Sequence, residues 1–266
     1  MLIDSHCHLD AREFQGKQAQ LIEQAQAVGV AHIVIPAVDK ASFSQVAALA
    51  NYPACVYALG IHPLYIMQAE EQDLDELEQR LQQEESRLVA VGEIGLDYFV
   101  AGLDRSRQQD FFVAQLKLAQ QFDLPVILHV RQAIDDVLKY LRRHPVRGGI
   151  AHAFNGSLQQ AQQLIQLGFK LGFGGACTYT RANKIRMLAE ELPLSSIVLE
   201  TDAPDIPPAW LENDQYNSPS ELPKITEVIA QLRGISVSQV AEITTKNVCD
   251  VLPKLAKLCT PAKVLL

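Results

Sequence analysis

Eight short apolar runs recur along this chain at intervals of about 20–45 residues and alternate with longer segments of helical periodicity. We expect the runs to form strands, at Leu2–Leu9, His32–Val38, Val56–Ile61, Leu88–Leu96, Val126–Val130, Gly149–Phe154, Phe169–Phe173 and Ile197–Glu200. The segments between them predict helices at Gln18–Val28, Phe43–Ala50, Leu74–Glu84, Ser106–Phe122, Ile134–His144, Leu158–Leu167 and Lys184–Glu190, and Lys224–Leu258 returns to helical period. This alternation restricts the chain to an α/β fold.

Two α/β architectures fit eight strand–helix repeats: a closed (β/α)₈ TIM barrel and an open, doubly wound sheet. The length of 266 residues is close to the roughly 250 residues of a typical barrel. Polar residues at or just past the C-terminal ends of the runs discriminate further: His6, His8, His62, Glu93, His129, His152 and Asp202. An open sheet concentrates its site at one switch point, whereas a barrel brings all strand ends to one mouth. We therefore predict a TIM barrel that forms a single domain over residues 1–266.

The first predicted strand carries two histidines on either side of Cys7. If Leu2–Leu9 is a β-strand, His6 and His8 project to one face, and Cys7 packs on the other. Two imidazoles placed in this way can hold one divalent metal ion, although chance strand histidines would give the same pattern. The polar residues at the other strand ends favour the metal site.

The other strand ends supply the remaining donors of such a site. Glu93 has two carboxylate oxygens and can bridge two metal ions, and His129 and His152 follow successive predicted strands with imidazoles that suit zinc and related ions. Asp202 can bind a metal and accept a proton from the attacking water, so Glu93 and Asp202 are the candidate catalytic carboxylates. Glu200 is expected deeper in the barrel, in a packing or hydrogen-bonding role.

Substrate contacts are predicted at the same mouth. His62 follows the third run, and Arg105 and Arg131 are the best-placed cations for an anionic substrate. The glycines within residues 172–175 suggest a phosphate contact through backbone N–H groups, although glycine also simply makes turns.

Composition limits the partners and the compartment. The net charge of −8 argues against a protein that binds nucleic acid by blanket phosphate neutralisation, but bound metal ions can supply positive charge locally. Five scattered cysteines without a C-x-x-C pair indicate free thiols and a reducing compartment, so we expect the cytoplasm. The sequence shows no signal peptide, no membrane-spanning run and no evidence of an obligate protein partner.

The ordered motifs of the chain resemble those of TatD-type metal-dependent deoxyribonucleases, members of the amidohydrolase-like barrels. The resemblance runs from residue 1 to about residue 250 and rests on His6-x-His8, Gly60-Ile61-His62-Pro63, Gly92-Glu93-Ile94-Gly95-Leu96-Asp97-Tyr98, Pro125-Val126-Ile127-Leu128-His129-x-Arg131, His152-x-Phe154-x-Gly156 and Glu200-Thr201-Asp202-Ala203-Pro204. It implies a fold of the metal-dependent hydrolase type and hydrolysis of phosphodiester bonds in DNA. It also implies two divalent ions per subunit (Zn, Mg or Mn), one held by His6, His8 and Asp202, the second by His129 and His152, with Glu93 between them.

Three positions depart from the family pattern. Ala153 and Asn155 stand where the family often has cysteine and serine, and Tyr216 stands where an arginine is common. None of the three is an expected ligand, but the missing arginine removes a natural phosphate contact and leaves the substrate open.

Three functions therefore compete. The first is a phosphodiesterase acting on DNA or a small phosphodiester, and the second is an amidohydrolase or esterase acting on a small molecule. Glu93 occupies the place where a carbamylated lysine would bridge the metals, which argues against the second. A non-enzymatic metal-binding protein is the third, and the complete ligand set argues against it.

Overall fold

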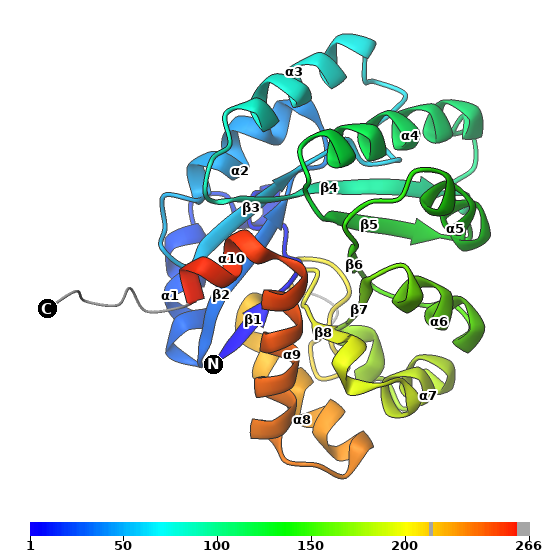
Figure 1. The fold of residues 1–266 in the computed structure, drawn as a ribbon. Coiled ribbons are helices and arrows are strands. Elements are labelled where there is room, and N and C mark those ends of the chain that lie inside the picture. Colours follow the sequence, from blue (N-terminus) through cyan, green and yellow to red (C-terminus); the bar gives the residue numbers. More distant parts are fainter. Residues whose placement is uncertain (213–214, 260–266) are drawn as a thin grey trace, which may run out of the picture.

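The computed structural model describes residues 1–212 and 215–259, in which eight parallel strands form one sheet in the order β1 to β8. The strands are β1 (Leu2–Asp4), β2 (Val30–Pro36), β3 (Cys55–Leu59), β4 (Leu88–Asp97), β5 (Val126–Arg131), β6 (Gly149–Ala151), β7 (Phe169–Phe173) and β8 (Ile197–Leu199). The first and last strands meet just past their ends, where Ser5 N–H donates to Leu199 O at 3.0 Å and His8 N–H donates to Ala203 O at 2.8 Å. The predicted TIM barrel is confirmed (Figure 1).

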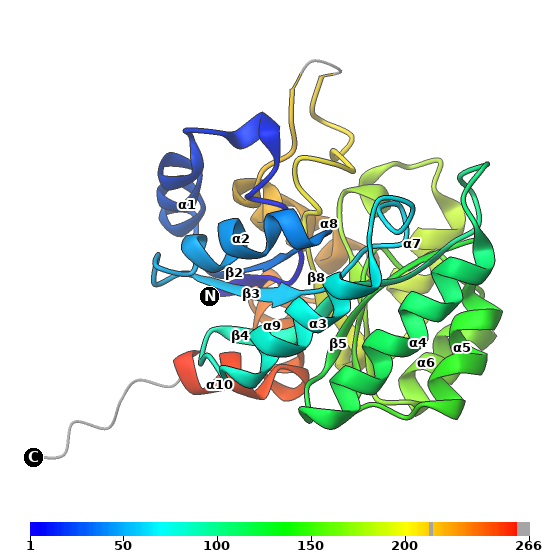
Figure 2. The same cartoon turned by 90° about the horizontal axis from the view of Figure 1, so that it is seen from above.

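Helices surround the sheet, as Figure 2 shows from above. They are α1 (Gln18–Ala27), α2 (Phe43–Leu49), α3 (Glu71–Gln82), α4 (Arg105–Gln121), α5 (Ile134–Arg143), α6 (Leu158–Gln166), α7 (Asn183–Glu191), α8 (Leu222–Arg233), α9 (Val237–Val251) and α10 (Pro253–Cys259). Short 3₁₀ turns lie at η1 (Arg12–Phe14), η2 (Lys40–Ser42), η3 (Gly175–Thr178), η4 (Leu194–Ser196) and η5 (Pro219–Glu221).

Capping contacts explain where two of these elements depart from the periodic pattern. The helix predicted from Leu74 begins at Glu71, because Asp73 accepts a hydrogen bond from Glu70 N–H at 3.0 Å. The C-terminal helical stretch divides at Gly234, whose φ of 62° ends α8, and Ser236 then caps α9 by accepting from Gln239 N–H at 3.2 Å.

The first strand is shorter than the sequence predicts. The prediction of a strand over Leu2–Leu9 is wrong beyond Asp4, so strict strand alternation does not place His6 and His8 on one face. The chain turns because the Asp4 carboxylate accepts from His6 N–H at 3.3 Å and from Thr201 N–H at 3.0 Å. A side chain that bonds nearby backbone groups competes with the strand ladder in this way.

Alternation along the strands produces two apolar cores. The larger lies between the sheet and the helices and contains Ile33 and Ile35 of β2. The smaller joins inward residues of β1 to β6 and β8, including Val34 of the same strand, to Val248, Val251, Leu252 and Leu255 of the C-terminal helices. Lys254 Nζ also donates to Glu85 O, just before β4, so α10 covers the N-terminal end of the barrel.

No helix within the described part of the chain is long and apolar enough to cross a membrane.

Candidate metal centre

A cavity of about 770 Å³ opens at the C-terminal end of the barrel. The residues that line it lie on β4 and β5 or follow other strands, and they include His8, His62, Glu93, Asp97, His129, Arg131, His152 and Asp202. His6 lies beneath them and is fully buried. The structure therefore brings together all six of the residues that the sequence suggests as metal ligands.

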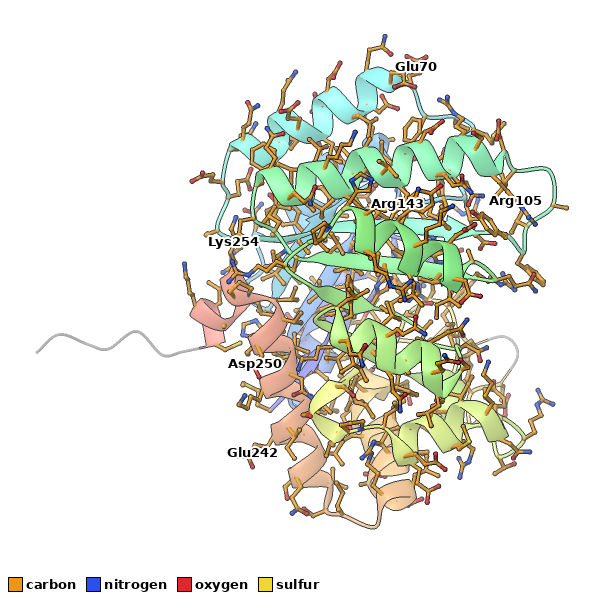
Figure 3. The ribbon with its side chains drawn as sticks, turned by 45° about the vertical axis from the view of Figure 1, so that its right-hand side comes forward. Glu70, Arg105, Arg143, Glu242, Asp250 and Lys254 are labelled. Carbon is orange, nitrogen blue, oxygen red and sulfur yellow. The ribbon has the colours of Figure 1, made fainter. Side chains whose placement is uncertain are left out.

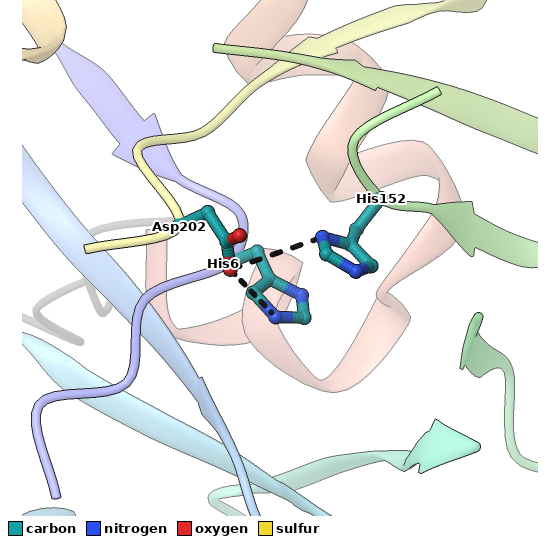
Figure 4. Close-up of side chains that lie close together, drawn as sticks. All are labelled: His6, His152 and Asp202. Atoms are coloured by element: carbon teal, nitrogen blue, oxygen red, sulfur yellow. Dashed lines mark ion pairs between the residues drawn. The ribbon is translucent and has the colours of Figure 1, made fainter. Parts of the chain in front are cut away.

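The first donor group surrounds His6 Nε2. This atom lies 3.2 Å from His8 Nε2, 3.2 Å from Glu93 Oε2 and 3.4 Å from Asp202 Oδ1. His8 Nε2 lies 3.5 Å from the same Glu93 oxygen and 3.7 Å from the same Asp202 oxygen. Figure 4 shows dashed lines from the Asp202 carboxylate to both His6 and His152, and His152 Nδ1 is 3.9 Å from Asp202 Oδ1.

The second donor group surrounds the other oxygen of Glu93. Its Oε1 lies 2.9 Å from His152 Nε2, 3.0 Å from His129 Nδ1 and 3.3 Å from His62 Nε2. His129 Nδ1 and His152 Nε2 are 3.3 Å apart. His62, which the sequence suggests only as a substrate contact, thus points a ring nitrogen into this donor group.

These spacings fit divalent metal ions. Donors around a tetrahedral ion with bonds of about 2.0–2.1 Å lie roughly 3.3–3.4 Å apart, near the separations in both groups. Imidazole with carboxylate is a donor set that zinc and related ions accept. Glu93 is only 1% exposed and contributes one oxygen to each group. The residues present therefore suit two ions on either side of one carboxylate.

Local backbone geometry places the donors. The register between β4 and β5 shifts between Val91 and Ile94, and Glu93, which lines the cavity, lies within this irregularity. Ala153 and Asp202 both have positive φ, 44° and 57°, so the chain bends sharply after β6 and β8. Such conformations are uncommon outside glycine and cluster at functional sites.

Burial and neighbouring charges shift the pKa values of the ionisable groups in this centre. Burial lowers the pKa of His8 and His152, but the carboxylates of Glu93 and Asp202 outweigh it and raise the values to about 9 and about 10. Burial and the neighbouring His129 lower the pKa of His62 to about 4. Burial raises the pKa of Glu93, but the surrounding imidazoles hold it well below its ordinary range. Two divalent cations bound by these donors would supply positive charge to the same carboxylates.

A layer of buried polar residues supports the centre from below. Glu200 accepts from Ala153 N–H at 2.5 Å and from Ser5 Oγ at 3.4 Å, the hydrogen-bonding role expected from the sequence. Burial raises its pKa to about 8. Gly172 makes room for it, since a Cβ there would lie 2.2 Å from Glu200 Oε2. This contact gives a glycine in the 172–175 segment a purpose other than binding phosphate. Cys7 is fully buried, as expected of a packing residue.

Sequence reasoning missed three polar residues next to the donors. Asp97, at the end of β4, accepts from His129 Nε2 at 3.0 Å. Gln108 and Gln115 lie two turns apart on α4, each 1% exposed, and pair with the backbone of Asp97 and Ile61 respectively. The seven-residue spacing of Gln108 and Gln115 on an otherwise apolar helix face is the signal that could have identified these two glutamines.

The two predicted arginines have different positions. Arg131 lines the cavity, and its guanidinium lies 3.6 Å from the centre of the Phe99 ring. Arg105 is exposed at the start of α4, 4.5 Å from the centre of the Tyr98 ring, and is not among the described residues that line the cavity (Figure 3). Arg12, which the sequence did not single out, lines the cavity from η1.

Comparison with known proteins points to one family. Residues 3–253 match the family described as TatD related DNase. The chain is 42% identical to the uncharacterized metal-dependent hydrolase YjjV of Escherichia coli (strain K12), over 92% of this chain and 95% of that protein. It is 32% identical to the human deoxyribonuclease TATDN3, over 97% of this chain and 96% of that protein.

A solved structure agrees with this assignment. The crystal structure of YjjV, a TatD homologue from Escherichia coli K12, superposes with a TM-score of 0.92 at 40% identity, covering 95% of this chain and 98% of that one. The phosphotriesterase of Mycobacterium tuberculosis, at 14% identity and a TM-score of 0.68, shares the fold. The strand-end donors, the barrel and these matches agree, and the chain belongs to the TatD family of metal-dependent hydrolases.

Proposed function

We propose that the protein is a phosphodiesterase that cleaves DNA with the help of two divalent metal ions. One observation carries the proposal: the two oxygens of Glu93 belong to two separate groups of imidazole and carboxylate donors. Paired ions on either side of a phosphate are a recurring arrangement for cleaving phosphodiester bonds. His6, His8 and Asp202 would hold one ion, and His129 and His152, joined by His62, would hold the other.

The chain's own residues have separate tasks in such a reaction. Bound divalent ions would neutralise the phosphate and make water acidic enough to attack near neutral pH. Asp202 accepts the proton from the attacking water at its carboxylate, which burial makes more basic by raising its pKa. Arg131, held against Phe99 at the cavity wall, contacts a phosphate oxygen.

The loops at the C-terminal end of the barrel suit the end of a DNA strand whose bases are unstacked. Among the described residues, six of the eleven exposed large apolar side chains lie on loops that follow β3, β4 and β8: Tyr65, Met67, Phe99, Val100, Trp210 and Tyr216. Aromatic side chains bind unpaired bases of any sequence by stacking. Because the chain carries a net charge of −8, we propose short or single-stranded ends as substrates and a shallow dependence of affinity on salt.

The negative net charge also favours one alternative function, that of a metal-dependent amidohydrolase or esterase that acts on a small molecule. Arg12 and Arg131 are the cations among the described residues that line the cavity, too few to follow a long phosphate backbone.

Five free cysteines in the described chain fit a reducing compartment, and we propose the cytoplasm.

A substrate panel tests the proposal. The protein is loaded with Mg²⁺, Mn²⁺ or Zn²⁺ and offered end-labelled single-stranded and duplex DNA, a chromogenic phosphodiester, a lactone and an N-acyl amino acid. An Asp202→Asn protein prepared in parallel excludes a contaminating nuclease. We expect cleavage of single-stranded ends by the wild type alone. Turnover of the lactone or the amide without cleavage of any phosphodiester would favour the alternative.

A further inference from the structure

Asp97 contacts the ring nitrogen of His129 that faces away from the metal centre. Its Oδ2 lies 3.0 Å from His129 Nε2, while His129 Nδ1 lies 3.0 Å from Glu93 Oε1. An ionised carboxylate only accepts hydrogen bonds, so Nε2 must carry a hydrogen. In the neutral ring, Nδ1 then has a lone pair directed at the second donor group, as metal binding requires.

The Asp97 carboxylate cannot rotate freely. Its Oδ1 accepts from Phe99 N–H at 2.9 Å and from Val100 N–H at 3.2 Å. Gln108 fixes the backbone of Asp97 on both sides, donating to its carbonyl and accepting from its N–H at 2.8 Å each. With the side chain 1% exposed, one oxygen is committed to the backbone and the other to His129.

We propose that Asp97 is a positioning residue that selects the His129 tautomer able to bind a metal ion at Nδ1. The inference rests on the proposed metal centre and adds a residue that touches neither ion nor substrate. Carboxylates that orient metal-binding histidines commonly change metal affinity about 10–100-fold when they are replaced.

The fixed Oδ1 makes the conservative substitution the informative one. In Asp97→Asn the amide oxygen must face Phe99 N–H and Val100 N–H, because an NH₂ group there would meet two donors. The NH₂ group then faces His129 Nε2 and donates to it, so the hydrogen of the neutral ring moves to Nδ1. That tautomer cannot bind a metal ion at Nδ1.

The Asp97→Ala substitution distinguishes tautomer selection from a purely structural role, because the two roles predict opposite orders of damage for Asp97→Ala and Asp97→Asn. Alanine removes the acceptor for both backbone N–H groups but leaves His129 free to adopt either tautomer. If Asp97 only shaped the loop, Asp97→Ala would therefore be the more damaging change. If Asp97 selects the tautomer, Asp97→Asn is the more damaging change for metal binding.

Zinc binding to the full-length protein separates these cases. Metal-free wild type, Asp97→Asn and Asp97→Ala are titrated with Zn²⁺ against a chromophoric chelator. The matched control is Asp104→Asn, which alters an exposed cap of α4 that accepts from Ser106 N–H and Arg107 N–H. We expect two tight sites in the wild type and the control. In Asp97→Asn we expect one site to weaken about 10–100-fold, and in Asp97→Ala to weaken less.

Three results on the variants would overturn the inference alone. One is an Asp97→Asn protein that binds zinc as the wild type does, and another is weaker binding by Asp97→Ala than by Asp97→Asn. The third is a metal-free Asp97→Asn protein that melts below Asp97→Ala, because the lost zinc would then reflect folding. A wild type that binds no zinc would overturn the proposed function as well, which distinguishes the two failures.

Discussion

The two ends of the barrel carry different residues. Histidines and carboxylates surround a cavity at the C-terminal end, whereas apolar side chains pack beneath α10 at the N-terminal end. The difference does not come from different strands, since β1, β4, β5 and β8 supply apolar residues to one end and, themselves or through the segments that follow them, donors to the other. TIM barrels commonly separate stability from chemistry in this way. We call the N-terminal end of the barrel, beneath α10, the closed end, and the C-terminal end with its cavity the open end. The closed end should therefore govern unfolding, and the open end should govern metal binding and catalysis.

The open end is costly to build. Buried charges destabilise a protein unless they are paired, and Glu93 depends on the imidazoles of His62, His129 and His152 for its partners. Ala153, Asp202 and Ile206 all have positive φ and all line the cavity. The closed end, where Leu255 is fully buried, has no such cluster of ionisable groups among its described residues.

The largest effect expected is that of metal removal, which acts on the open end alone. Exhaustive chelation should reduce hydrolysis to background, and Mg²⁺, Mn²⁺ or Zn²⁺ should restore it, because mixed nitrogen–oxygen sites accept several ions. Activity and metal content are measured on the same samples. Full activity in protein verified to be metal-free would contradict the proposed mechanism.

The next effect separates a proton acceptor from a simple ligand within the open end. Asp202→Asn keeps one possible oxygen ligand but removes the base, so kcat should fall about 10²–10⁴-fold. His152→Ala should lose metal first, and excess metal should restore part of its activity. Turnover and bound metal are followed across a metal titration for both variants. If excess metal restores Asp202→Asn to near wild-type turnover, the base must lie elsewhere.

The sequence predicted these two ends to different degrees. Helical and strand periodicity indicated the barrel, and the position of polar residues at run ends indicated the mouth and its donors. Periodicity could not show that β1 stops at Asp4, because that depends on a hydrogen bond to Thr201, distant in the chain. Nor could it distinguish Arg131 from Arg105, since both follow strands and only the fold places one of them in the cavity.

Residues that support the ligands were the hardest to predict. Asp97 and Gln108 are residue types that usually lie on surfaces, and their function depends on burial that the sequence alone does not report. The sequence indicated His62 as a residue of the barrel mouth, but its approach to Glu93 Oε1 depends on the fold that brings β3 and β4 side by side.

A substitution at the closed end should give the reverse pattern of the metal experiments. Leu255→Ala leaves a cavity under α10 and should reduce the free energy of unfolding by about 2–5 kcal/mol. The kcat of the folded protein should not change, because the removed atoms lie at the opposite end from the donors. Denaturant unfolding and kcat are measured together, with Val237→Ala on the exposed face of α9 as the control. A large fall in kcat would show that the two ends are coupled.

The smallest effect expected is a dependence of metal-free stability on pH that arises at the open end. His8 and His152 have pKa values of about 9 and about 10 in the folded protein, above the ordinary value of 6.5 that an unfolded chain would show. The folded state therefore holds protons that the unfolded state releases, and this stabilisation is complete below pH 6.5 and is lost as the pH rises through 9 to 10. The lowered pKa of His62, about 4, acts only at acidic pH and leaves this window unaffected.

Metal ions should reverse that trend, because they bind the deprotonated imidazoles and compete better as the proton concentration falls. The melting temperature should fall between pH 7 and 9 in chelator and should hold or rise in zinc. The zinc-loaded series controls for titration elsewhere in the chain, since both samples share every other group. Parallel curves with and without zinc would mean that His8 and His152 hold no extra protons in the metal-free protein. The contrast between the two barrel ends would then rest on packing alone.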